Sequence, residues 1–465
     1  MFPQCYATLR RSTAKVTGRV LLGATSAALA WLSQTQTASA IPSFAVQTGQ
    51  PCAACHVGAF GPQLTQFGRD FKLYGYVSSD GKSHWPAVSA MVEGSFTHTK
   101  ADQNPAPQYF NTNNNLSVDQ VSLFYGGVII PDLMGAFVQA TYDGIGHTIH
   151  WDNTDIRLAK EASIAGKDLI WGITLNNNPS VQDLWNSTPG WRYPYVQANG
   201  TFLPVNPGPP SAVIDGGLAQ LVGGAGLYGM WNDLLYAEFD VYKQMSTSVM
   251  PALGLSISGI DIYSGVIPYW RVALQHAFGN EKHNIQVGTY GLQASRYPGG
   301  DRSSGTTDVY TDTAFDINYQ WYSNPKDVTA NILSTHATYI HEDQNLRATS
   351  FAGGSNPKDS LNTMRADLSY SIAATYTPSV SYFRTTGSSD DLLYWNNVNP
   401  KPNSAGWMAE LAYSPWGKPD SPFVWLNPHV TLQYTAYTEY NGSTAGASQN
   451  NTIFLNLWWA FGLPH

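Results

Sequence analysis

The sequence predicts an all-β fold, a transmembrane β-barrel of about 16 strands. Only 12% of the residues are charged, compared with about 25% in an ordinary soluble domain. Aromatic residues make up 13% of the chain, and Gly, Asn, Ser and Thr are abundant. No stretch after the first 40 residues has the ~18 or more consecutive apolar residues of a membrane helix. A composition of many strands and turns therefore fits a membrane barrel better than a globular enzyme.

Residues 1–40 have the pattern of a secretory signal peptide. Four basic residues before position 20 precede a short apolar run at 20–32, and Ala38-Ser39-Ala40 supplies a small-residue cleavage site. The mature chain is expected to begin near Ile41. Removal of the signal takes the formal net charge from −8 to −12 and removes one of the three cysteines, so both remaining cysteines lie in one short motif.

That motif is Cys52-Ala53-Ala54-Cys55-His56, the Cys-x-x-Cys-His pattern of c-type haem attachment. The two thiols would form thioethers to a haem, and His56 would be the proximal ligand of its iron. A disulfide would not need the histidine, and a thioredoxin-like pair would need a βαβ context that the flanking sequence lacks. A zinc site would need a second pair of ligands, and the mature chain has no other cysteine. The motif therefore predicts one covalent haem c.

The segment 41–85, about 45 residues long, is too short to bury a haem by itself. We expect it to pack in or on the lumen of a barrel formed by residues 86–465. The distal ligand must come from the end of the segment or from the barrel, and His84 and Met91 are the nearest candidates. Each has an ordinary alternative role, His84 in a turn and Met91 in packing.

Two basic residues of the segment are further candidates. Arg69 and Lys72 could pair with the haem propionates. The alternative is that both are solvated charges on a short amphipathic helix.

Strict alternation supports the barrel. In residues 235–242 the odd-numbered side chains are apolar, whereas the even-numbered ones include Glu238 and Asp240. Residues 308–322 and 452–461 alternate in the same way. Carboxylates on one face and apolar groups on the other predict a polar lumen and a lipid-facing surface.

The connections alternate in length, as in outer-membrane barrels. Short turns are predicted at 131–132, 231–233, 279–283, 323–327 and Pro378, and long loops at 100–116, 177–215, 245–264, 342–361 and 387–405. An even number of strands returns both chain ends to the periplasm, and the last strand ends in the aromatic Phe461. The sixteen predicted strands are 87–99, 117–130, 133–143, 148–160, 167–176, 216–230, 234–244, 265–278, 284–296, 307–322, 328–341, 362–377, 379–386, 406–414, 425–440 and 451–461.

The amino-terminal segment also resembles a known family. Residues 41–45, 47–49, 52–56, 67–73 and 75–76 are similar to the signature of the fused outer-membrane cytochrome–porins, over roughly residues 41–76. The resemblance implies a monohaem segment joined to a barrel of about sixteen strands. It also implies that Cys52, Cys55 and His56 bind the haem and that 67–73 packs against it. Iron-oxidising bacteria use such proteins to take electrons from extracellular Fe(II).

The function expected from these observations is an outer-membrane electron conduit of a Gram-negative bacterium. Extracellular Fe(II), or another small donor, would reduce the haem, and a periplasmic cytochrome or copper protein would accept the electron, which corresponds to an Fe(II):cytochrome c oxidoreductase. An acidic lumen and rim would attract cations. Candidate iron-docking groups are His147, His150, Asp152, Asp155 and the run His341-Glu342-Asp343. His147 and His150 would lie on opposite faces of a strand, and solvation at a loop tip is the ordinary alternative for the run.

Two other functions are compatible with the sequence. The first is a porin whose haem segment is a plug or a sensor, because sixteen strands can enclose an aqueous channel. The second is a haem peroxidase, which would need an open distal position and a catalytic His or Arg beside it. Nothing in the sequence resembles a phosphate-binding loop, a hydrolase triad or a nucleic-acid-binding surface.

Overall fold

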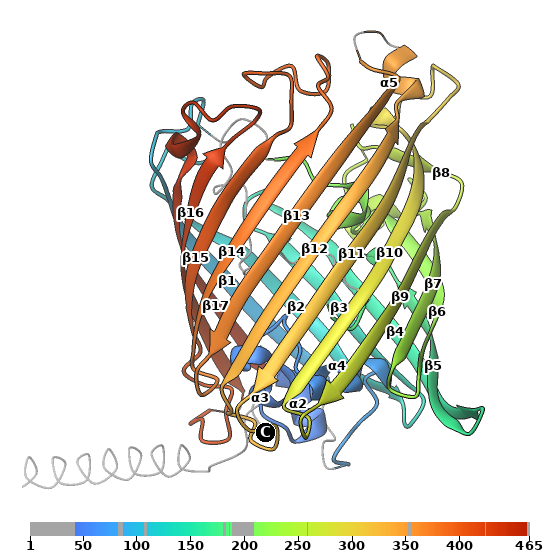
Figure 1. Ribbon diagram of the computed structural model, residues 1–465, viewed down its shortest axis with the longest axis vertical. Helices are drawn as coiled ribbons and strands as arrows, with labels where there is room; N and C mark the ends of the chain where they lie inside the picture. Colours follow the sequence, from blue (N-terminus) through green and yellow to red (C-terminus); the bar gives the residue numbers. More distant parts are fainter. Residues whose placement is uncertain are drawn as a thin grey trace, which may run out of the picture.

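The computed structural model describes residues 42–81, 87–106, 109–179, 183–185, 187, 209–257, 259–351, 353, 355–423 and 425–462. Within them the chain forms a closed antiparallel β-barrel of 16 strands (Figure 1), so the predicted fold class is confirmed. β1 pairs with β2 on one side and with β17 on the other, and this second pairing closes the barrel. A seventeenth strand, β8, has only three residues and pairs with β10 beyond the end of β9.

All sixteen predicted strands are present, with ends that differ by a few residues. The barrel strands are β1 (Val88–Thr99), β2 (Asn115–Ile130), β3 (Met134–Asp143), β4 (Thr148–Ile164), β5 (Lys167–Asn176), β6 (Val222–Trp231), β7 (Leu235–Gln244), β9 (Ile267–Phe278), β10 (His283–Tyr297), β11 (Asp308–Tyr322), β12 (Ile332–Asn345), β13 (Lys358–Ser371), β14 (Tyr376–Gly387), β15 (Ser404–Tyr413), β16 (Leu426–Glu439) and β17 (Thr452–Gly462), and β8 is Ile262–Ser264. The helical elements are α2 (Pro42–Thr48), α3 (Cys52–Cys55), η1 (Val57–Ala59), α4 (Gln66–Leu73), η4 (Val213–Gly217), η5 (Met250–Leu253), η6 (Pro298–Gly300), α5 (Arg347–Phe351) and η7 (Ala447–Asn450).

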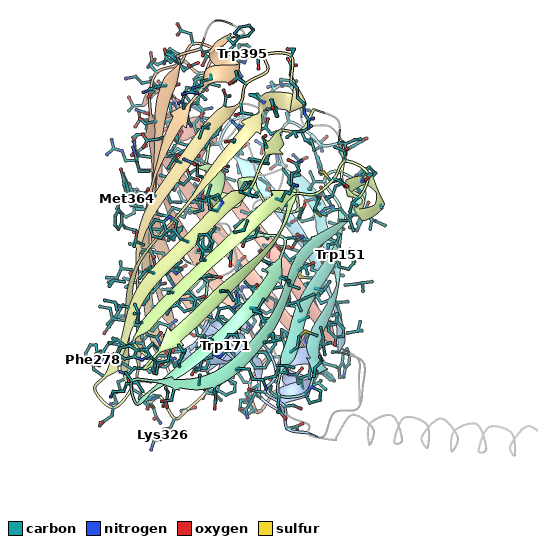
Figure 2. The ribbon with its side chains drawn as sticks, turned by 90° about the vertical axis from the view of Figure 1, so that its right-hand side faces the viewer. Trp151, Trp171, Phe278, Lys326, Met364 and Trp395 are labelled. Atoms are coloured by element: carbon teal, nitrogen blue, oxygen red, sulfur yellow. The ribbon has the colours of Figure 1, made fainter. Side chains whose placement is uncertain are left out.

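The alternation of β7 shows how the sequence forms this wall. Its apolar residues Phe239 and Val241 are 55% and 40% exposed on the outer surface, whereas Glu238 and Asp240 face inward and are buried. The outer surface of the barrel therefore carries apolar side chains, including the labelled Trp151, Trp171 and Phe278 in Figure 2. Apolar residues outside and charged residues inside are the reverse of a soluble protein and typical of a transmembrane barrel.

Most short connections lie at one end of the barrel and most long ones at the other, as predicted. Two-residue and three-residue turns such as 165–166 and 232–234 lie at one end, the turn end, and the longer loops at the other, the loop end. The last strand, β17, ends at the turn end (Figure 1). Among the described residues no helix is long and apolar enough to cross a membrane.

One predicted turn is wrong. Pro378 lies inside β14, and the turn falls at Ala373 and Ala374, which have φ of 50°. The last pair of the β13–β14 ladder is Ser369 with Ser379, so Pro378 lies just beyond it, and its missing N–H removes no hydrogen bond to β13. Proline at the start of a strand is permitted for this reason, and the sequence pattern alone did not distinguish it from a turn.

The interior of the barrel is filled by two parts of the chain. The segment from α2 to α4 lies inside the barrel at the turn end (Figure 1). Described residues of the connection between β5 and β6 also pack inward: Leu184 and Trp185 form a buried cluster with Leu73 of α4 and with Tyr228 and Tyr236. Closer to the loop end, residues 212–214 pack against another buried cluster of barrel side chains. The segment from α2 to α4 and these described residues of the connection thus lie together in the lumen.

Candidate functional site

The two cysteines of the haem-attachment motif are buried at the turn end of the lumen. Cys52 and Cys55 are the first and last residues of α3, they are 0% and 7% exposed, and neither forms a disulfide. His56 follows with extended backbone (φ −125°, ψ 136°) and forms an isolated antiparallel bridge with Leu64. The backbone changes from helical to extended at His56, so this residue lies just outside α3.

The helix α4 holds α3 in place. Thr65 caps α4, since its hydroxyl accepts a hydrogen bond from the Gly68 amide at 3.2 Å and donates to the Ala54 carbonyl at 2.5 Å. Gly68 lies so close to α3 that a Cβ atom there would be 2.2 Å from the Cys55 carbonyl oxygen. The glycine therefore allows α4 to pack directly on the helix that carries the cysteines.

The barrel wall contacts the attachment motif directly. The Asn427 side-chain amide on β16 donates to the Cys52 sulfur at 3.2 Å and to the Ala59 carbonyl at 2.8 Å. The Ala53 amide donates to the Gly417 carbonyl at 3.0 Å, in the connection between β15 and β16. This connection, between the end of β15 and the start of β16, is long for the turn end.

Aromatic side chains of the barrel enclose the residues after His56. Phe60 stacks on the His429 ring at 4.5 Å between centroids and 10° between planes, and contacts Trp458 edge-on at 5.0 Å. The His429 Nδ1 atom hydrogen-bonds with the Ser414 hydroxyl at 2.9 Å. The Trp458 indole N–H donates to the Met91 sulfur at 2.8 Å. Strands β1, β16 and β17 thus form one side of the candidate site.

The other side is formed by β11 and β12. The Gln63 amide contacts the Ser334 hydroxyl and the His336 Nε2 atom, the latter at 3.1 Å. The opposite ring nitrogen of His336 hydrogen-bonds with Asp367 at 2.8 Å. Val57 packs against Tyr322. The residues of the attachment motif and those that follow it, up to Gln63, are therefore contacted from both sides of the barrel.

Burial determines the protonation of the motif. It lowers the pKa of His56 to about 4, so the imidazole is neutral at neutral pH, as a metal ligand must be. Burial also raises the pKa of Cys55 to about 12 and the pKa of Cys52 well above its usual value. Both thiols stay protonated in the closed structure, and a protonated thiol is a poor nucleophile.

The residues of the motif fit a c-type haem. Neither thiol is used in a disulfide, and the neighbouring imidazole is neutral. The His56 Nδ1 atom is buried and has no hydrogen-bond partner among the described residues, so the fold leaves part of this ring uncommitted. Such an atom is costly to bury without a partner and is typical of a site that receives another group.

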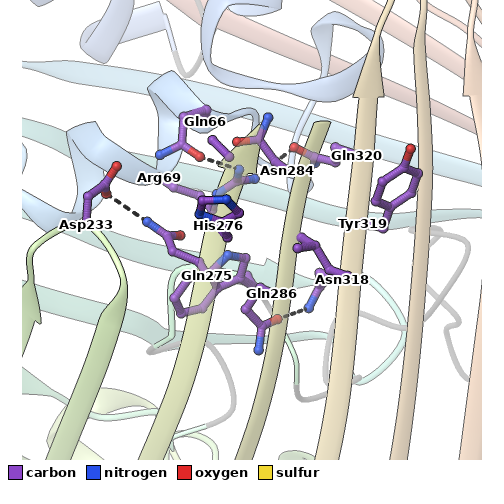
Figure 3. Close-up of a pocket in the computed structure, with 13 residues that line it drawn as sticks. Gln66, Arg69, Asp233, Gln275, His276, Asn284, Gln286, Asn318, Tyr319 and Gln320 are labelled. Atoms are coloured by element: carbon purple, nitrogen blue, oxygen red, sulfur yellow. Dashed lines mark hydrogen bonds between the residues drawn. The ribbon is translucent and has the colours of Figure 1, made fainter. Parts of the chain in front are cut away.

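Arg69 and Lys72 are buried, 5% and 9% exposed, so their interpretation as solvated charges is wrong. The Arg69 guanidinium donates to the Leu64 carbonyl at 3.0 Å and to the Gln320 side chain at 2.9 Å. It borders a polar pocket between α4 and strands β9–β11 (Figure 3). The Arg69 Nε atom is buried without a partner among the described residues, and pairing with a propionate stays a prediction.

Of the two predicted distal ligands, the structure describes Met91 alone. His84 lies outside the described residues. Met91 faces the lumen and is 6% exposed, with its sulfur accepting the hydrogen bond from Trp458. The sequence analysis did not single out His429 or His336. Alternation alone could have identified His429, because it shares the polar face of its strand with Thr431 and Gln433.

The predicted iron-docking groups do not form one site. Asp155 is buried in an ion pair with Arg157 at 2.9 Å and accepts from the Tyr76 hydroxyl at 2.6 Å, so its placement at the surface is wrong. His341-Glu342-Asp343 lies within β12, not at a loop tip, and alternation places Glu342 inside the barrel and the other two outside. In the described part of the chain no three His, Cys, Asp or Glu side chains are grouped to hold a metal ion.

The remaining candidates at the loop end have structural contacts. The His147 ring stacks on Tyr109 at 4.5 Å between centroids, and Asp152 accepts hydrogen bonds from Thr141 and Gln220. His150 is one residue from the lipid-facing Trp151 on β4. These positions are separate features of the rim.

No family model and no curated protein matches this chain. Similar solved structures include the outer membrane channel DcaP of Acinetobacter baumannii, with 9% identity and a TM-score of 0.44 over 80% of this chain and 96% of that chain. OmpF of Salmonella typhi in complex with daunomycin has 9% identity and a TM-score of 0.43, over 80% and 97% of the two chains. OprB of Pseudomonas putida has 12% identity and a TM-score of 0.42, over 80% and 93%.

The assignment of this chain therefore depends on its own architecture. A closed antiparallel barrel of 16 strands carries apolar side chains outside and charged side chains inside, with short turns at one end and long loops at the other. These are the features of the barrels of bacterial outer membranes. The protein is an outer-membrane β-barrel of a Gram-negative bacterium, with its turn end in the periplasm.

Proposed function

We propose that this protein is an outer-membrane electron conduit with one covalent haem c at the periplasmic end of its lumen. The observation that carries the proposal is the position of Cys52, Cys55 and His56 inside the barrel mouth, where both cysteines are buried and neither forms a disulfide. A membrane barrel has no structural need for a Cys-x-x-Cys-His motif at that place.

Cys52 and Cys55 would hold the haem by addition of each S–H across a vinyl group. Each sulfur would bond to one vinyl carbon, and its hydrogen would go to the other. His56 would provide a nitrogen ligand to the iron, and burial keeps this imidazole neutral at neutral pH. Because burial also keeps both thiols protonated, we expect attachment to precede closure of the segment into the barrel.

The bound haem would supply a one-electron Fe(III)/Fe(II) couple, so that each extracellular Fe(II) oxidised to Fe(III) delivers one electron to a periplasmic cytochrome or copper protein. This reaction corresponds to an Fe(II):cytochrome c oxidoreductase. The donor needs no dedicated binding site, because electron transfer to a haem can be outer-sphere. The predicted net charge of −12 for the mature chain favours the approach of cations.

The filled lumen supports a conduit because it limits water around the site. Leu184 and Trp185 pack on Leu73 of α4, and residues 212–214 pack inside the barrel nearer the loop end. A hydrophobic environment that excludes water affects the reduction potential of a metal centre and limits access of oxygen and solvent to it. These contacts give the inward-folded connection a role as insulation.

Stopped-flow reduction of the purified oxidised holo-protein by Fe(II) tests this function. We expect fast reduction, saturating with Fe(II) concentration, followed at the haem absorbance bands. The variant His56→Ala should lose this fast reduction by Fe(II). If another small donor reduces the haem and Fe(II) does not, the conduit is retained and Fe(II) is excluded as its donor. If no external donor reaches the haem, the conduit itself is wrong.

The second candidate function is a porin whose haem segment is a plug or a sensor. The location of α2 to α4 inside the barrel favours it, because a plug occupies the same place. Planar-bilayer conductance separates the two functions. A large open-pore current in the holo-protein would favour the porin, and a sealed barrel would favour the conduit.

A further inference from the structure

We infer that the Nε2 atom of His429, on β16, would be the second protein ligand of the haem iron. The inference rests on the function proposed above and assigns a barrel residue to its site. It replaces the two candidates that sequence position alone provided, His84 and Met91.

Few histidines can reach the lumen. The chain has 11 histidines, and in the described ranges His336 and His429 are the two that are buried, 3% and 8% exposed, with their side chains facing the lumen. His276 and His341 are on the outer side of their strands, and His98 is at the loop end. The search for a nitrogen ligand within the described barrel is therefore a choice between two residues.

The ring of His429 is held in place by two contacts. Phe60 covers one face of it, and the Ser414 hydroxyl hydrogen-bonds to Nδ1 at 2.9 Å. Among the described residues no hydrogen bond is made by Nε2. When Nδ1 donates to Ser414, Nε2 carries the free lone pair. A ligand histidine is commonly fixed in this way by a partner on its other nitrogen.

The same face of β16 contacts the attachment motif. Asn427 is two residues before His429, so both side chains point into the lumen about 7 Å apart along the strand. Asn427 donates to the Cys52 sulfur and to the Ala59 carbonyl. Phe60, which stacks on His429, is only four residues after His56. The strand that presents His429 is therefore already in contact with the proposed thioether sulfur.

The competing residues are already engaged. Both ring nitrogens of His336 have partners, Asp367 at 2.8 Å and Gln63 at 3.1 Å. The Met91 sulfur accepts the Trp458 indole N–H at 2.8 Å. Ligation by either would break one of these contacts, whereas ligation by His429 would break none that the structure contains.

Ligation by His429 has two consequences. Two histidine ligands give a lower reduction potential than one histidine and one methionine. The bond would also join the amino-terminal segment to β16, so the segment and barrel would be linked through the metal. The electron would then enter and leave a site whose two halves come from opposite ends of the sequence.

The test is electron paramagnetic resonance and near-infrared magnetic circular dichroism of the full-length oxidised holo-protein in detergent. Wild type should show a low-spin ferric haem with the charge-transfer bands of two histidine ligands. His429→Ala should lose that signal and become high-spin, and added imidazole should restore the low-spin state. His429→Met should give the distinct near-infrared band of histidine–methionine ligation and a higher potential.

Matched controls are His336→Ala and Met91→Leu, which should both keep the wild-type spectrum. A low-spin bis-histidine signal that persists in His429→Ala would overturn the inference, as would its loss in His336→Ala or Met91→Leu instead. If His429→Ala does not fold, the inference is tested with His429→Met, which keeps a side chain of similar length. The near-infrared band of histidine–methionine ligation is then the deciding observation. Haem staining of the denatured wild type is separate: its absence would refute the proposed function rather than the ligand assignment.

Discussion

At the residue scale, the haem-attachment motif depends on a small number of side chains that bring α3, α4 and β16 together. Asn427 is the most direct, because one amide group contacts both the Cys52 sulfur and the Ala59 carbonyl. Gly68 is equally specific, because the Cys55 carbonyl occupies the place where any larger residue would put its Cβ atom. Asn427 is not conspicuous in the sequence, whereas Gly68 lies within the stretch 67–73 that carries the family resemblance.

Gly68→Ala should loosen the packing of α4 on α3. The added Cβ would lie 2.2 Å from the Cys55 oxygen, and forced overpacking costs about 1–3 kcal/mol. That cost corresponds to about a 5-fold to 150-fold change in the equilibrium constant for separating α4 from α3. We expect alkylation of Cys52 and Cys55 in the haem-free protein to accelerate by a similar factor. The control Gly223→Ala has its nearest atom 4.0 Å from the new Cβ, and equal labelling rates in the two variants would contradict this packing.

Lys72 should make the protein more stable as the pH rises. Burial, reinforced by the charge of Arg157, lowers the pKa of Lys72 to about 8, whereas a lysine in an unfolded chain has a pKa of about 10.4. Between these values the unfolded chain binds more protons than the folded one. The free energy of unfolding therefore rises with pH, by about 2 kcal/mol between ~pH 7.5 and ~pH 9.5.

The measurement is urea unfolding of the refolded protein in lipid vesicles across that pH range. Lys72→Met should abolish this part of the slope, since methionine fills a similar space and does not titrate. A slope that is the same in wild type and variant would assign the pH dependence to other groups.

At the scale of secondary-structure elements, the connection between β5 and β6 is held in the lumen by carboxylates on neighbouring strands. Glu342 of β12 accepts a hydrogen bond from the Val213 amide at 2.6 Å, and Asp312 of β11 accepts one from the Ile214 amide at 2.7 Å. The two acidic residues are opposite each other in the β11–β12 ladder. This pair fixes the start of η4 against the barrel wall.

Glu342→Ala and Asp312→Ala, combined, should release this connection and raise ion conductance. Each substitution leaves a backbone N–H without its acceptor, at a cost of about 1–3 kcal/mol. Single-channel recording in planar bilayers should show open events that are absent in wild type. Glu342→Gln keeps an acceptor oxygen and should behave like wild type. The adjacent Asp343→Ala, on the outer face, is the position control, and equal conductance in all variants would show that these bonds do not seal the lumen.

At the scale of the whole molecule, the barrel is defined by the contrast between its two surfaces. Phe239 and Val241 face the lipid from β7, and Glu238 and Asp240 face the filled lumen from the same strand. Closure between β1 and β17 leaves no free edge, so backbone groups along the strands are paired within the sheet. The barrel wall can therefore insulate whatever its lumen holds.

Phe239→Arg should destabilise the barrel in a membrane. Phe239 is 55% exposed in the middle of β7, and an arginine on the lipid face costs about 2–4 kcal/mol near the midplane of the bilayer. The free energy of unfolding in lipid vesicles should fall by that amount. Val398→Arg, in the loop between β14 and β15, replaces a residue that is 80% exposed and should have little effect. Equal losses in both variants would argue against a lipid-facing position for Phe239.

The sequence by itself determined the architecture and the attachment motif. Alternation in residues such as 235–242 is a local signal, because each strand must present one face to lipid and the other to the lumen. Cys52, Cys55 and His56 are recognisable because their spacing is local as well. The start of β14 at Tyr376 was missed because proline is permitted at a strand start as well as in a turn.

Only the tertiary structure decided which barrel residues meet that motif. Asn427 is 375 residues from Cys52, and Phe60 stacks on His429 from a similar separation. The partners are set by closure of the barrel and by the register of β16 and β17 against β1, which no local pattern specifies. Asp155 was predicted to lie at the surface. In the closed barrel it is buried and contacts Arg157 and Tyr76. Local chemistry determined what the segment can bind, and long-range packing determined what surrounds it.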